Sequence, residues 1–226
     1  MGVIIVGDIE VEKTKNLTKK YFSSIKAKKI QPKFSYPIIP PYNDTIFASV
    51  TDPEFTQIFF NVLNRQPKLF IDTGVNYKNY VIRDLSEDIL NKRFKKNTLE
   101  YVTPIISSDV SINEFSYHEQ VYAYGGILKE NEIIQGVTFL LTEIERIKQN
   151  GFLSEELEYA KKQYLKSLDT SLSEKNSTQS LKILNEIKRH YLEKEMLSGI
   201  DYELKLAKQI LSEINLEIGR AHVWTP

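Results

Sequence analysis

Residues 56–63, Thr56-Gln57-Ile58-Phe59-Phe60-Asn61-Val62-Leu63, form a run of β-branched and aromatic residues that is typical of a strand. A second run of this kind occupies residues 46–50, and Asp52-Pro53 separates the two as a turn. The apolar period then becomes helical, and the expected buried stripe consists of Val81, Leu85, Ile89 and Phe94. Strands followed by a long helix predict an α+β domain.

Beyond this helix the pattern alternates once more between strands and helices. Residues 99–126 are rich in Tyr, Val and Ile and predict a meander that ends at Gly125-Gly126, a strand-to-helix turn. The remaining third predicts helices over 133–147, 157–172, 181–191 and 204–211. Asn150-Gly151 should end the first, Ser154 should cap the second, and the polar residues 173–180 should break the chain before the third.

The first 44 residues predict a separate unit and a linker. Residues 3–6 are a continuous apolar run that indicates a buried strand, Gly7-Asp8 breaks it, and apolar residues at helical spacing follow over 17–25. Asp8 is placed to cap or precede that helix. Four prolines lie between residues 26 and 44, so we interpret residues 31–44 as a Pro-rich linker.

Composition excludes several classes of protein. The chain has 226 residues, and 30 Lys plus Arg balance 30 Asp plus Glu, which argues against a nucleic-acid partner. It has no Cys, which excludes a disulfide scaffold, a thiolate metal site and a cysteine nucleophile but leaves the compartment open. No apolar run approaches the roughly 18 residues of a membrane span. We interpret the lysines at 26, 28, 29 and 33 as a solvated run rather than an anion site.

The candidate catalytic and metal-binding residues are few. The three histidines are His118, His190 and His222, and no His-Glu-x-x-His or His-x-x-Glu-His is present. His118-Glu119 lies in an expected strand, where neighbouring side chains point to opposite faces, and His190 lies in a charged helix that we expect to be exposed. Gly125-Gly126 lacks a phosphate-binding pattern. Three strand tyrosines, which we expect to be packing pairs rather than a peptide-binding surface, are Tyr117, Tyr122 and Tyr124.

Four strings, in this order, resemble the insulinase/pitrilysin family of zinc metallopeptidases, of the long bacterial type. The first is Val3-Ile4-Ile5-Val6-Gly7-Asp8 with Lys19-Lys20-Tyr21-Phe22, which is similar to the end of the family's first domain. The second and third, similar to parts of its second domain, are Asp52-Pro53-Glu54-Phe55-Thr56-Gln57 and Leu90-Asn91-Lys92-Arg93-Phe94. The fourth lies within residues 141–161 and includes Gly151-Phe152 and Glu156-Leu157-Glu158-Tyr159-Ala160-Lys161.

The resemblance implies that residues 1–30 are the last β-α unit of one peptidase-like domain and residues 45–217 most of a second, non-catalytic one. It implies that the zinc-binding His-x-x-Glu-His precedes Met1. We therefore expect no catalytic, cofactor-binding or metal-binding residue in this chain, with zinc and the remaining domains supplied by the full-length parent. The implied parent is a zinc metalloendopeptidase that hydrolyses peptides or unfolded protein, and this chain forms part of its substrate cavity.

Two alternatives stay open. The parent is either such a peptidase or a zinc-less structural homologue that acts in binding or assembly, because fold does not imply function. Similarity to long bacterial members favours a periplasmic or cell-envelope location. Residues 218–226 depart from the family pattern and match translated read-through of a synthetic sequencing adapter, with Trp224 from an in-frame TGA. A natural divergent tail is the alternative, and we assign His222 no role.

Overall fold

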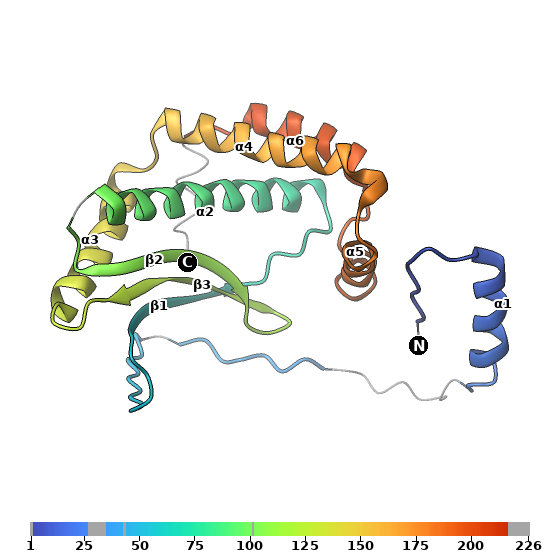
Figure 1. Ribbon diagram of the computed structural model, residues 1–226, viewed down its shortest axis with the longest axis horizontal. Helices are drawn as coiled ribbons and strands as arrows, with labels where there is room; N and C mark the ends of the chain where they lie inside the picture. Colours follow the sequence, from blue (N-terminus) through green and yellow to red (C-terminus); the bar gives the residue numbers. More distant parts are fainter. Residues whose placement is uncertain (1, 27–34, 43, 101, 217–226) are drawn as a thin grey trace.

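The computed structural model describes residues 2–26, 35–42, 44–100 and 102–216, and within them six α-helices accompany one three-stranded antiparallel sheet (Figure 1). This is the predicted α+β class. No helix in these ranges is both long and apolar enough to cross a membrane. The elements, in chain order, are α1 (Val11–Phe22), β1 (Ile58–Pro67), α2 (Gly74–Glu100), β2 (Ile105–Glu114), β3 (Glu119–Leu128), α3 (Ile133–Asn150), α4 (Ser154–Ser173), the 3₁₀ turn η1 (Lys175–Ser177), α5 (Ser180–Glu193) and α6 (Ile200–Glu213).

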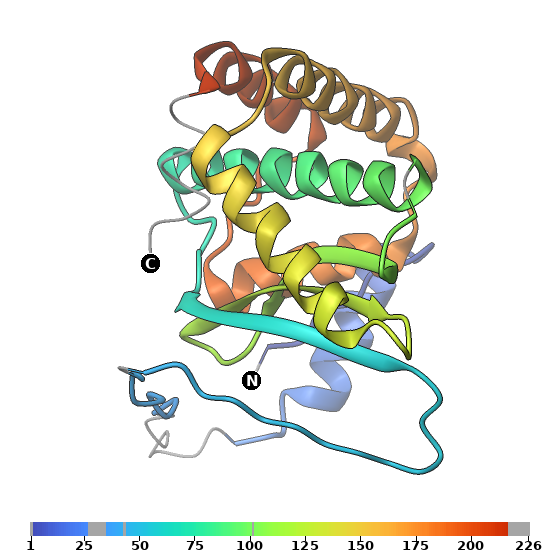
Figure 2. The ribbon, with the colours of Figure 1, turned by 90° about the vertical axis from the view of Figure 1, so that its left-hand side faces the viewer.

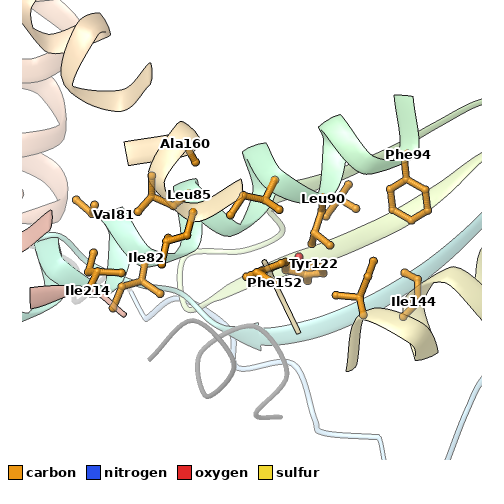
Figure 3. Close-up of a cluster of buried hydrophobic side chains, with 14 of the residues drawn as sticks. Val81, Ile82, Leu85, Leu90, Phe94, Tyr122, Ile144, Phe152, Ala160 and Ile214 are labelled. Atoms are coloured by element: carbon orange, nitrogen blue, oxygen red, sulfur yellow. The ribbon is translucent and has the colours of Figure 1, made fainter. Parts of the chain in front are cut away.

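Helix α2 is the centre of the fold because it is buried on two sides. One side packs on the sheet and the other on α4, with α6 beside α4 in the outer layer (Figures 1 and 2). Figure 3 shows Ala160 of α4 above the helix and Tyr122 of β3 below it. The predicted stripe of Val81, Leu85, Ile89 and Phe94 is buried, and Ile82 and Leu90 add a second buried side that the single-stripe prediction missed.

The sheet is not the predicted meander. Strand β3 lies between β1 and β2 and pairs antiparallel with both. Residues 99–100 belong to α2. Within the described residues, the region predicted as a meander therefore contains one hairpin, β2–β3, and no strand comes after it. Because α2 connects β1 to β2, β1 is left at one edge of the sheet and β2 at the other.

Gly125 and Gly126 were predicted to end the strand, and this prediction is wrong. Both lie inside β3, the central strand of the sheet. A Cβ atom built on Gly125 would overlap the carbonyl oxygen of Phe60 in β1, and one on Gly126 would overlap that of Ser107 in β2. A register irregularity in β2 between Ile105 and Ser107 accompanies this close approach. The two glycines are required because both neighbouring backbones come close to β3 here.

Two predicted strands are absent from the sheet. Residues 3–6 and residues 46–50 have no strand structure among the described residues, although both have strand composition. A strand exists only when a second backbone takes up its N–H and C=O groups, and neither run has such a partner here. The apolar side chains of 46–50 are accordingly exposed, with Phe47 and Val50 91% and 92% accessible, and in the run 3–6 Val3 and Ile5 are exposed whereas Ile4 and Val6 are half-buried.

The helix ends follow the predictions more closely. Gly151 ends α3 with φ 68°, the break before α5 contains η1, and Gly199 precedes α6 with φ 70°. Asp8 precedes α1, as one of its two predicted positions, and the N-cap itself is Glu10. The predicted cap Ser154 is wrong, because the N-cap of α4 is Leu153. At α4 the Glu156 carboxylate accepts a hydrogen bond of 2.8 Å from the Leu153 N–H and satisfies one free donor of the helix end.

Arg93 connects two of the four sequence strings on which the family resemblance rests, residues 90–94 and the string within residues 141–161. The Arg93 guanidinium donates to both Glu156 oxygens, at 2.6 and 2.5 Å, and to the Gly151 carbonyl at 3.0 Å. It also lies 5.5 Å from the centre of the Phe152 ring. Burial works against the Glu156 charge, but hydrogen bonds from Arg93 and the Leu153 N–H outweigh it and lower the pKa of Glu156. Arg93 therefore joins α2 to the start of α4.

Replacing Gly125 with Ala should destabilise the sheet. The added methyl group meets the Phe60 carbonyl, so we expect the free energy of unfolding to fall by about 1–3 kcal/mol. Gly74→Ala is the matched control, because no atom lies within 4 Å of its Cβ position, and it should leave stability unchanged or raise it by up to about 1 kcal/mol. Urea unfolding followed by circular dichroism measures both, and equal effects would contradict the close approach at Gly125.

Replacing Arg93 with Met should destabilise the chain in a pH-dependent way. Loss of the charged hydrogen bonds should cost about 1.5–3 kcal/mol at pH 7. Because the folded-state pKa of Glu156 is lowered, its contribution is present above the unfolded pKa of about 4.3 and is lost as pH falls through the folded value. The urea midpoints of wild type and variant should therefore approach each other as the pH falls through the folded-state pKa of Glu156, with a remaining gap from the lost bond to the Gly151 carbonyl. Lys161→Met, which removes an i,i+3 pair on α4, should change stability by less than about 0.5 kcal/mol at either pH.

Candidate functional site

One face of the sheet carries no helix. Side chains from alternate positions of the strands point toward α2, including Phe60, Tyr122 and Val110. The opposite face, which we call the open face, consists of Phe59, Asn61, Leu63 and Arg65 of β1 with their neighbours on β3 (Val121, Ala123, Gly125 and Ile127) and β2 (Asp109, Ser111 and Asn113). Figure 2 shows irregular chain from the segment before β1 on that side, with the blue helix α1 behind it. Leu63 is 64% exposed and Phe59 50%, so this face presents apolar side chains to solvent.

The two outer strands of the sheet differ in whether a side chain is hydrogen-bonded to their outer edge. The outer edge of β2 is occupied by Asn91 of α2, whose side-chain amide donates to the Val110 carbonyl at 2.9 Å and accepts from the Val110 N–H at 2.8 Å. Asn91 thus replaces a neighbouring strand at that point. The outer edge of β1 has no paired strand among the described residues. An extended peptide adds to a sheet through a free edge, so β1 is the edge that can accept one.

Arg65 fastens the end of the linker to this face. Residues 35–42, which we call the strap, run below the sheet, and Arg65 donates to the Pro40 carbonyl at 2.8 Å. The Arg65 guanidinium lies 4.8 Å from the centre of the Tyr42 ring and 3.2 Å from Glu119 Oε1. The last part of the predicted Pro-rich linker is therefore bound to the sheet.

An aromatic cluster at the β2–β3 turn holds the other end of the strap. Tyr36 stacks on Tyr117, with ring centres 3.8 Å apart and planes 5° apart, and Phe70 lies 5.7 Å from Tyr117. Among the strand tyrosines, Tyr122 is buried in the core and Tyr124 packs against it, which confirms the prediction that they serve packing. Tyr117 lies in the turn rather than in a strand.

A large hollow lies between α5 and the rest of the domain, and we call it the α5 groove. It has a volume of about 1060 Å³ and is lined by parts of α2, α4, α5 and the ends of β2 and β3. Lys68 crosses its floor between Glu114 at 2.6 Å and Glu193 at 2.9 Å. Burial disfavours the Lys68 charge, but the hydrogen bonds to the two carboxylates outweigh it and raise the pKa of Lys68.

A second polar group closes the groove near the start of α6. The Tyr77 hydroxyl lies 3.2 Å from that of Tyr164 and donates to Glu203 at 3.1 Å. Burial raises the pKa of all three groups, although the hydrogen bond from Tyr77 works the other way on Glu203. Since these groups are partnered with one another, they stabilise the wall of the groove, and nothing here forms a nucleophile with a base.

The described residues do not fit a zinc ion. They contain no group of three or more His, Cys, Asp or Glu side chains close enough to hold a metal, whereas a catalytic zinc needs three protein ligands. His118 lies in the β2–β3 turn, exposed, rather than in a strand, and Glu119 begins β3. His190 is exposed on α5 as predicted, with Nδ1 2.6 Å from the Glu195 carbonyl oxygen. His222 and residues 218–226 lie outside the described residues, as do Lys28, Lys29 and Lys33.

The sequence was compared with models of protein families. Residues 1–164 match the family described as "Peptidase M16 inactive domain". The chain belongs to the peptidase M16 (insulinase) family, as an inactive domain. This confirms the resemblance drawn from the four strings, because the matched range includes all of them.

Relatives and solved structures agree with this membership. The chain is 20% identical over 216 residues to an Arabidopsis thaliana protein described as "Zinc protease PQQL-like", covering 95% of this chain and 20% of that protein. It superposes on the first half of the periplasmic protease PqqL from Escherichia coli with a TM-score of 0.82 and 15% identity, covering 95% of this chain and 46% of that one. A predicted insulinase family protease from Yersinia pestis gives 0.79 at 16% identity, with 96% and 46% coverage. The M16 inactive domain described here thus spans only part of the length of these proteins.

Sequence reasoning did not identify the residues that shape the open face of this M16 inactive domain. Asn91 stands in the quoted Leu90–Phe94 string, but no role was predicted for it, and its contact with the edge of β2 appears only in the structure. Arg65 gave no signal, because its partners at Pro40 and Glu119 lie 25 and 54 positions away in the sequence.

Replacing Tyr36 with Ala should loosen the strap. An aromatic pair contributes about 0.5–1.5 kcal/mol, so cleavage within residues 35–42 by a non-specific protease should become about 2- to 10-fold faster. Tyr202→Ala on α6, where the side chain is 55% exposed, is the control and should leave cleavage of the strap unchanged. Unchanged cleavage in Tyr36→Ala, measured by mass spectrometry of the fragments, would show that the stack does not hold the strap.

Proposed function

We propose that this chain is the non-catalytic, cavity-forming part of a zinc metalloendopeptidase that hydrolyses peptides or small unfolded proteins. The observation that carries the proposal is the open face beside the free edge of β1, in a domain of the inactive M16 type. In this proposal zinc and the catalytic groups come from another part of the parent protein, and residues 1–30, 31–44 and 45–217 are the end of one domain, a linker and most of a second domain.

The chemistry of the open face suits an unfolded chain rather than a folded partner. It offers two kinds of contact, the apolar side chains of Phe59 and Leu63 and the unpaired backbone groups of β1. Backbone pairing is independent of sequence, and scattered apolar contacts add affinity without a strict requirement for one residue. Such a wall holds many different peptides, which a cavity for unfolded substrates requires.

A zinc-less homologue that acts in binding or assembly is the second candidate. It is favoured by the inactive nature of the matched domain, which does not itself require a catalytic partner. The deciding observation is the sequence before Met1 in the full-length parent. An intact His-x-x-Glu-His with a later Glu, and hydrolysis of an unstructured peptide that a chelator abolishes and zinc restores, supports the peptidase. Absence of the motif together with retained peptide binding supports the scaffold.

A periplasmic or envelope location is proposed from the likeness to Escherichia coli PqqL.

Replacing Leu63 with Lys in the full-length parent should weaken substrate binding without removing the chemistry. Loss of one buried apolar contact, worth about 1.5 kcal/mol, should raise KM about 10-fold while kcat changes less than about 2-fold. Leu141→Lys is the control. Leu141 is 43% exposed on α3, a helix that contributes no residue to the open face, so this substitution should leave both constants unchanged.

Backbone pairing has a test of its own. A peptide methylated on alternate backbone nitrogens cannot donate on one edge, so its binding to the chain should be at least about 10-fold weaker than that of the unmethylated peptide, measured by fluorescence anisotropy. Equal binding of both peptides, or equal effects of Leu63→Lys and Leu141→Lys, would show that the substrate does not use this face.

A further inference from the structure

Helix α5 stands apart from the rest of the domain. It has no buried residue, and the α5 groove separates it from α2 and the sheet (Figure 1). A helix of 14 residues is marginal in water on its own, so its stability has to come from packing of an apolar face. The apolar face of α5 therefore needs a surface to pack against.

The stripe of Leu184, Ile187 and Tyr191 on α5 does not line the groove. The residues of the helix that do are Leu181, Lys182, Ile183, Asn185, Glu186, Arg189 and Glu193. At 100° per residue, the stripe lies on the side of the helix opposite Lys182, Glu186 and Glu193. Leu184 and Ile187 are nevertheless half-buried.

The N-terminal run lies at this side of the helix. A Cβ atom at Gly2 would lie 3.3–3.6 Å from atoms of the Tyr191 ring. Along the same run Ile4 and Val6 are half-buried, whereas Val3 and Ile5 are exposed. Because alternate residues of an extended chain share one side, Ile4 and Val6 lie on the side of Gly2. Figure 1 shows the N-terminus and α5 as neighbours, with α1 beyond them.

Neither surface belongs to a hydrophobic core cluster in the part of the chain that the structure describes. The run at 3–6 has strand composition but no paired strand, and α1, which follows it, has no buried residue. The groove side of α5 is joined to the body by the ion pair Lys68–Glu193.

We infer that α5 is a docking helix for the N-terminal unit: its stripe of Leu184, Ile187 and Tyr191 binds the even-numbered side of residues 2–6 and the sheet to which that run belongs. In sequence α5 is part of the second domain, but it packs on the first and moves with it. The joints are at its two ends, the η1 turn before it and Lys194 after it, which has a left-handed φ of 61°. The inference uses the domain division of the proposed function but neither zinc nor peptide binding.

A photo-crosslink tests the contact. The chain carries p-benzoylphenylalanine in place of Tyr191, is irradiated, and is digested for mass spectrometry. We expect crosslinks to residues 2–9. The same group in place of Tyr202, an exposed tyrosine on α6, is the control and should give no crosslink to that run. Crosslinks from position 191 into the α2 and sheet body would overturn the inference.

A second measurement does not depend on a reactive group. Ile187→Asp should make proteolytic cleavage within residues 2–9 at least about 10-fold faster, whereas Leu192→Asp, at an exposed apolar position off the stripe, should not change it. Equal effects, or none, would contradict the docking. Mixing ¹⁵N-labelled and unlabelled chains separates contacts within one chain from those between two copies, and crosslinks found only between copies would also overturn it. Failure here leaves the Leu63 and zinc tests of the proposed function unaffected.

Discussion

The contact of Arg93 with Glu156 and Gly151 is the interaction on which the arrangement of layers depends. Helix α2 is apolar on two sides and therefore has no preferred outer face of its own. Apolar burial is non-directional and fixes neither the rotation nor the axial position of such a helix. The two short hydrogen bonds from Arg93 to Glu156 and the third to the Gly151 carbonyl are directional, so they set where α4 begins relative to α2.

The open face follows from this two-sided burial. Since α2 covers one face of a three-stranded sheet and α4 and α6 pack behind α2, all the helices with extensive packing lie on one side. The sheet then keeps one uncovered face and two edges. Asn91, two positions before Arg93, occupies the edge of β2, and the edge of β1 is left for a partner. The same helix thus completes the core and decides which edge of the sheet is available.

Local pattern predicted the helices well and the strands less well, for a physical reason. Helical hydrogen bonds are local, so period and glycine stops placed α3 to α6, including the left-handed turn at Gly151. A strand depends on distant backbone, and residues 46–50 and 3–6 have the right composition but no partner. The role of Gly125 and Gly126 was predicted wrongly because it depends on the close approach of Phe60 and Ser107, which exists only in the folded chain. The same holds for the candidate site, where Arg65 and Asn91 act through contacts between remote segments.

The two fastenings of the N-terminal part together define its geometry. The strap is bound to the sheet at Arg65 and at the β2–β3 turn through Tyr117, and the run at residue 2 contacts α5 at Tyr191. A body attached at two separated points has far fewer orientations than one on a free linker, because the second attachment becomes intramolecular. The α5 groove lies between α5 and the domain body, so a shift of the N-terminal unit that carries α5 with it changes the width of the groove. Lys68, held between carboxylates on β2 and α5, joins the two sides of that groove, so such a shift has to act against this pair of ion pairs.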